Sequence, residues 1–130
     1  MTGQPDELSA VIDALHGDKK AVLKDQVKTI EEEIGERRLI AADTSLVIKD
    51  ELQELRNESL NLTHTEEGLG DRDRKDRLFV EKQRLDLSRE LRGEQRDSWK
   101  DVQNLRREER EVEKELSTSD KEHRRARELL

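Results

Sequence analysis

The sequence predicts an all-α fold: a long antiparallel coiled-coil helical hairpin with short terminal helices, which we expect to oligomerise into a helical bundle. The first supporting observation is a run of apolar residues at a spacing of seven: Val27, Ile34, Ala41, Ile48, Leu55, Leu62 and Leu69. This spacing keeps one stripe of a helix facing a partner helix. The second observation is composition, since 45% of the residues are charged and 30% are hydrophobic. Such a chain can fill a narrow seam between helices but not a globular core.

Two glycines provide the third observation, a turn between the arms of the hairpin. Gly68 and Gly70 are followed by Asp71, a pattern typical of a helix end, a turn and a new helix cap. We therefore expect the hairpin to span residues 18–116, with its turn at about 66–73.

Short helices are expected at both ends of the chain. Residues 1–17 form an amphipathic helix in this interpretation, because Pro5 and two acidic residues open it and Gly17 ends or kinks it. Residues 117–130 form a C-terminal helix, because Ser119 and Glu122 have the spacing of a capping box.

The second arm of the hairpin has its own apolar stripe, formed by Val80, Leu87, Leu91, Val102, Leu105, Val112 and Leu116. The polar seam positions between them are Arg84, Gln95, Ser98 and Glu109. One antiparallel register pairs Ile34 with Leu105 and Ile48 with Leu91, and it places the turn at the glycines. A long parallel coiled coil, in which the glycines are a local interruption, is the alternative fold.

A second apolar stripe lies off the seam on both arms. It consists of Leu39, Leu46 and Leu60 on the first arm and Leu78, Leu85 and Trp99 on the second. Two packed helices cannot bury this stripe. We therefore expect it to bind a partner, with a homodimer through this zone as the main prediction. The alternative is a set of scattered surface leucines, which are normal when single.

The sequence does not indicate an enzyme. It contains no cysteine, and its histidines, His16, His64 and His123, are far apart along the chain. An activated nucleophile beside a base is therefore not expected, and we expect no catalytic residue, no cofactor and no metal. Asp120 and His123 have a spacing that resembles half of the Glu-x-x-His motif of di-iron bundles, but no second copy is expected. In the expected register, His16 faces His123.

Four acidic residues gather at the expected turn: Glu66, Glu67, Asp71 and Asp73. A hairpin with an acidic tip resembles in architecture the coiled-coil hairpins that enter the secondary channel of RNA polymerase. The resemblance implies that tip carboxylates reach a catalytic metal there. It covers the hairpin alone, because those factors have a further globular domain and share no sequence motif with this chain. The alternative interpretation is that these acids and glycines only cap helices and solvate a turn.

Partners other than proteins are less favoured by the sequence. The candidate contact for RNA or DNA is Arg124, Arg125 and Arg127, but acidic residues interleave with the arginines and the net charge is −7. No apolar run is long enough to span a membrane, and the N-terminus lacks the pattern of a signal peptide. We therefore expect a cytoplasmic protein, or a virion component assembled in the cytoplasm.

Taken together, these features favour a non-enzymatic scaffold or adaptor that acts through protein–protein contacts in a larger assembly. One alternative is a regulator that inserts its acidic tip into a channel of a nucleic-acid machine such as RNA polymerase. A second alternative is a ribosome- or nucleic-acid-associated factor.

Overall fold

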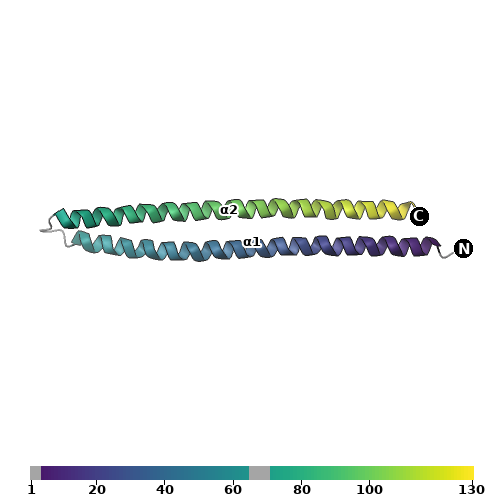
Figure 1. Ribbon diagram of the computed structural model, residues 1–130, viewed down its shortest axis with the longest axis horizontal. Coiled ribbons are helices and arrows are strands. Elements are labelled where there is room, and N and C mark those ends of the chain that lie inside the picture. Colours follow the sequence, from purple (N-terminus) through teal and green to yellow (C-terminus); the bar gives the residue numbers. More distant parts are fainter. Residues whose placement is uncertain (1–3, 65–70) are drawn as a thin grey trace. The chain divides into compact units, whose positions relative to one another are not determined.

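Two long helices make up nearly all of the computed structural model, which describes residues 4–64 and 71–130 (Figure 1). α1 spans Gln4–His64 and α2 spans Asp71–Glu128. No strand occurs within these ranges, so the predicted all-α class is confirmed. The interval between the helices overlaps the predicted turn, of which residues 71–73 belong to α2 and residues 66–70 lie outside the described residues.

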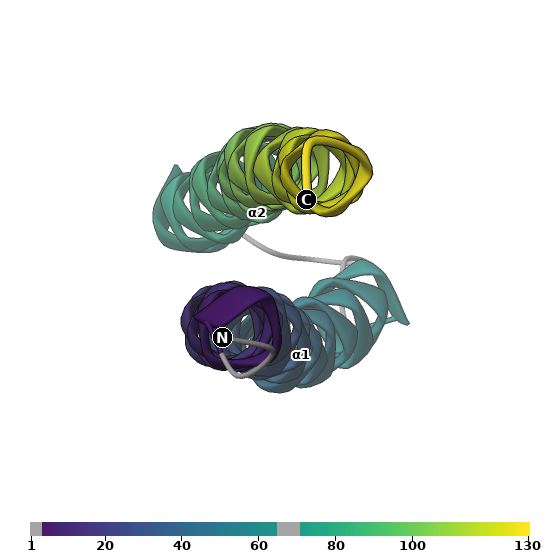
Figure 2. The same ribbon diagram turned by 90° about the vertical axis from the view of Figure 1, so that its right-hand side faces the viewer.

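The helix pair comprises two units. The terminal unit is formed by Met1–Glu36 and Val102–Leu130, and the central unit is formed by Arg37–Asp101. In each unit, a segment of α1 and a segment of α2 lie side by side and run antiparallel (Figure 1 and Figure 2). This is the pairing of the predicted hairpin, and it differs from the parallel alternative.

A small apolar cluster holds the two helices together in the terminal unit. Ile30 and Ile34 of α1 are buried with Val102 of α2, and Leu105 and Val112 pack against them. Leu105 therefore packs on the cluster that contains Ile34, as the predicted register requires. Fully burying a side chain of this kind contributes about 1.5–3 kcal/mol, so a few such residues supply much of the cohesion of a narrow seam.

The central unit continues the seam with few buried residues. Ile48 of α1 and Val80 of α2 are buried. Half-buried apolar residues accompany them along the two helices: Ala41, Leu52, Leu55, Leu87 and Leu91. All of these belong to the seven-residue repeats or lie one helical turn from them, which is why a chain with so few apolar residues can pair its helices.

The expectation of separate short terminal helices is wrong. α1 continues through Gly17, and α2 continues through residues 117–120. Ser119, which was expected to cap a new helix, is buried instead, with its Oγ 3.3 Å from Nδ1 of His16. Interhelical packing therefore continues past both sites. It offsets the cost of a helical glycine, about 1 kcal/mol relative to alanine, so neither segment ends a helix.

Replacing a seam isoleucine should destabilise the protein far more than replacing an exposed one. We expect Ile34→Ala to lower the free energy of unfolding by about 2–4 kcal/mol, because it leaves a cavity in the buried cluster. Ile40, which is exposed, provides the matched control, and Ile40→Ala should change stability by less than about 0.5 kcal/mol. Urea unfolding followed by circular dichroism measures both, and equal losses would contradict the assigned seam.

Candidate interaction surfaces

Two histidine–aspartate pairs cross between α1 and α2 in the terminal unit. His16 Nε2 lies 3.0 Å from Asp120 Oδ1, and His123 Nε2 lies 2.7 Å from Asp13 Oδ1. The two imidazole rings stack, with their centroids 4.1 Å apart and their planes inclined by 12°. The predicted proximity of His16 and His123 is thus confirmed.

These pairs come from two copies of one motif, Asp13-x-x-His16 on α1 and Asp120-x-x-His123 on α2. The expectation that Asp120-x-x-His123 has no second copy is therefore wrong, because Asp13 and His16 repeat its spacing. Residues three apart share one face of a helix, and antiparallel packing lets each histidine meet the aspartate of the other copy. The repeated spacing is the sequence signal that identifies the cluster.

Cations flank both aspartates of the cluster. Lys20 Nζ lies 3.7 Å from Asp120 Oδ1, and Arg127 Nη2 lies 3.5 Å from Asp13 Oδ2. The hydrogen bond with His123 lowers the pKa of the Asp13 carboxyl, and the charge of Arg127 adds to this effect. Arg127 also donates a hydrogen bond to Ser9 Oγ at 3.0 Å.

The cluster joins the two helices through side-chain contacts. Within residues 4–64 and 71–130, no group of His, Asp and Glu side chains is placed to hold a metal ion. Each histidine Nε2 instead faces an aspartate of the opposite helix. The three arginines proposed as a nucleic-acid contact are all exposed, and Arg127 also donates a hydrogen bond to Ser9.

Arg37 forms a second polar contact across the seam, in the central unit. Its Nη1 donates to Glu94 Oε1 at 2.7 Å, and its Nε donates to Asp101 Oδ2 at 2.8 Å. The hydrogen bonds to Asp101 and then to Glu94 raise the pKa of the guanidinium. Sequence reasoning missed this network, although Arg37 follows Ile30 and Ile34 at seam spacing. A charged residue at such a position is itself a signal of a partner across the seam.

The six residues of the predicted second stripe are exposed, with 52–68% of their surface accessible. All six belong to the central unit, and Leu85 of α2 lines a groove between the helices together with Gln53 of α1. Residues seven apart share a helix face, and both lining residues belong to the two seven-residue series. The residues are Leu39, Leu46 and Leu60 in the series of Gln53, and Leu78 and Trp99 in the series of Leu85. We call these six residues together the apolar face.

The opposite side of the central unit also has a groove. A second groove at the same level shares no lining residue with the first, so it lies on the other side of the helix pair. Its acidic lining residues are Glu51, Glu54, Glu58 and Asp86. The charged lining residues beside the apolar face are Lys49, Arg56, Arg84 and Glu81, and the last two form an ion pair at 2.9 Å. By the same seven-residue spacing, the exposed residues Ile40 and Val47 share a helix face with Glu54, and exposed Phe79 shares one with Asp86, so apolar residues are exposed beside both grooves.

The acidic tip proposed from the sequence is not placed by the structure. Glu66 and Glu67 lie outside the described residues, and Asp71 and Asp73 lie in the first turn of α2, where only the backbone is described. The regulator hypothesis that depends on these four residues stays a prediction.

Comparison with known proteins gives no relative. No protein-family description matches the chain, and no curated protein or solved structure is significantly similar to it. In the part of the chain that is described, no helix is both long and apolar enough to cross a membrane. Function is therefore inferred from the surfaces of the two units.

Acid should weaken the terminal unit through Asp13. Because its folded-state pKa is depressed, its contribution to the free energy of unfolding is present above its unfolded pKa, about 4. That contribution disappears as the pH falls through the lower folded value. Asp13→Asn should therefore flatten the decline in stability below about pH 5, whereas Asp18→Asn, at an exposed position, should keep the wild-type profile. Urea unfolding at a series of pH values measures this, and superimposable profiles for wild type and Asp13→Asn would contradict it.

Proposed function

We propose that this chain is a non-enzymatic scaffold or adaptor of the cytoplasm, or of a virion assembled there, and that it acts through protein–protein contacts. The observation that carries the proposal is the apolar face of the central unit. Six large apolar side chains, each more than half exposed, lie along the two helices of this unit. Apolar surface concentrated in this way is typical of interaction sites.

We further propose that the first occupant of the apolar face is a second copy of the chain, which gives a four-helix bundle. Completing the burial of six half-exposed side chains on each copy contributes on the order of 10 kcal/mol before the cost of association. That cost is roughly 4–15 kcal/mol, so the expected dimer is of moderate affinity and its population depends on concentration. Trp99, the single tryptophan, lies within this face and is of the residue type that most often anchors interfaces.

Glutamate substitutions in the apolar face should abolish self-association. We expect the wild-type chain to sediment with twice the mass of one chain at high concentration, and Leu46→Glu/Leu85→Glu to sediment with the mass of one chain. Leu129→Glu/Leu130→Glu is the matched control, because these leucines are exposed and lie outside the apolar face, and it should keep the wild-type mass. Analytical ultracentrifugation over a range of concentrations measures this.

Two results would count against the dimer. A wild-type mass of one chain at every concentration would do so directly. Equal dissociation of the control variant would show that added charge, rather than the apolar face, controls assembly. The emission of Trp99 gives an independent readout, since it should shift to shorter wavelength on association in wild type and in the control variant only.

A further inference from the structure

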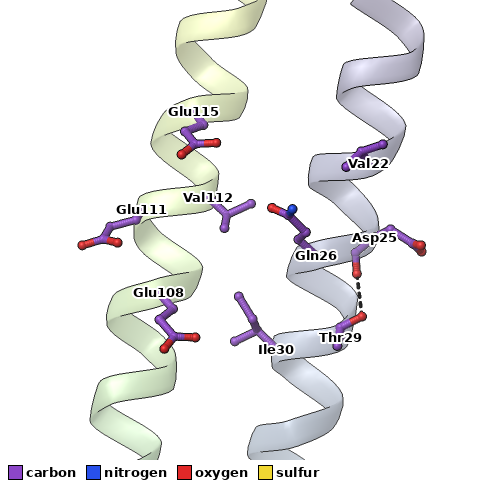
Figure 3. Close-up of a pocket in the computed structure, with 9 residues that line it drawn as sticks. All are labelled: Val22, Asp25, Gln26, Thr29, Ile30, Glu108, Glu111, Val112 and Glu115. Atoms are coloured by element: carbon purple, nitrogen blue, oxygen red, sulfur yellow. Dashed lines mark hydrogen bonds between the residues drawn. The ribbon is translucent and has the colours of Figure 1, made fainter.

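An open groove between α1 and α2 in the terminal unit has walls of different chemistry (Figure 3). Its apolar lining residues are Val22 and Ile30 of α1 and Val112 of α2, and Ile30 and Val112 point toward one another between the helices. The α2 wall carries Glu108, Glu111 and Glu115. Neither lysine nor arginine lines this groove.

The groove continues along the same side of the terminal unit. A second open groove is lined by Leu15 of α1 and Glu122 of α2. Leu15 precedes Val22 by seven residues and Glu122 follows Glu115 by seven, so each pair shares a helix face. The two grooves therefore form one surface, which we call the acidic groove.

The two walls of the acidic groove are asymmetric. Leu15 and Val22 on the α1 wall are exposed at 65% and 58%, and Leu8, one heptad before Leu15, is exposed at 53%. The α2 wall presents a row of carboxylates at helical spacing. Lys19 is the one lysine or arginine that lines either groove. A ligand that fits here needs an apolar strip beside a strip of positive charge.

We propose that the acidic groove binds an amphipathic helix of a partner protein that carries lysine or arginine along one flank. A helix laid into a groove between two helices buries its own apolar residues at i, i+3 or i+4 and i+7, here against Leu15, Val22 and Ile30. Its basic flank faces the carboxylates of α2, so opposite charges fix its orientation and speed its encounter. The groove is a different surface from the apolar face, and its occupation does not depend on dimerisation of the central unit.

The probe for this proposal is a synthetic amphipathic peptide of about three heptads, with leucine on one face, lysine along one flank and alanine elsewhere. A second peptide, with glutamate in place of lysine, reports charge selectivity. We expect the lysine peptide to bind at least about tenfold more tightly than the glutamate peptide, and its affinity to fall as salt rises. Absence of binding by the lysine peptide, or equal binding of both, would overturn the proposal.

Variants of the protein distinguish binding of the peptide in the groove from non-specific attraction between a basic peptide and an acidic protein. Glu108→Gln/Glu111→Gln/Glu115→Gln should weaken binding of the lysine peptide about tenfold or more. Leu15→Ser/Val22→Ser tests the apolar wall and should also weaken binding of the lysine peptide. Both changes lie at exposed positions, and circular dichroism should show the wild-type helix content.

The matched control, Glu31→Gln/Glu32→Gln/Glu113→Gln, removes the same net charge from exposed positions of the terminal unit that line neither groove. Its affinity for the lysine peptide should be within about twofold of the wild-type affinity, because only long-range, salt-screened attraction is lost. An equal loss in the control would overturn the proposal. Self-association that the groove variants abolish, without peptide binding by wild type, would also overturn it and assign the groove to a second copy of the chain.

Discussion

The burial of a narrow apolar seam between α1 and α2 is the interaction on which the rest of the structure depends. Long helices in proteins owe most of their stability to packing of an apolar face rather than to propensity. Here the seam consists of a few buried residues, such as Ile34, Ile48, Val80 and Val102, with half-buried neighbours. Because a two-helix seam is so narrow, large apolar residues at other positions, such as Leu46 and Leu85, stay exposed. The exposed apolar surfaces that we propose as docking sites are therefore a direct consequence of the way the helices pair.

Polar contacts within the seam define how the helices align. Arg37 bonds to Glu94 and Asp101 in the central unit, and His16 and His123 bond to aspartates in the terminal unit. Partly exposed ion pairs add little net stability. When a charged or polar group at a seam position loses its partner, however, the folded state is destabilised. A shift of one helix along the other would unpair these groups. Their structural role is therefore to select one register among those that a regular apolar repeat would allow.

The sequence predicted the helices and the exposed stripe from apolar periodicity, and the antiparallel pairing from that periodicity together with the two glycines between the arms. It failed where packing overrides a local signal. Gly17 and Ser119 have the chemistry of helix ends, yet both lie within helices whose interhelical contacts continue past them. Gln95 was assigned to the seam, but Gln95 is exposed and Glu94 takes the half-buried position. A helix of 3.6 residues per turn drifts from a strict seven-residue repeat. The change of seam position from Gln95 to Glu94 could therefore be found only from the structure. The spacing of Asp13 and His16 could be read from the sequence. Its contact with His123 could be recognised only once the register of the two helices was known.

The most direct test of this account is an interhelical cross-link between the seam residues Ile34 and Val102, which share one buried cluster. The natural chain contains no cysteine, so Ile34→Cys/Val102→Cys introduces the only two thiols. In dilute, mildly oxidising solution, the account predicts a disulfide within one chain, seen as faster migration of the monomer on non-reducing gels. The single variant Ile34→Cys should give few covalent dimers under the same conditions. Covalent dimers formed equally well by both variants, with no internal disulfide, would contradict antiparallel pairing within the chain.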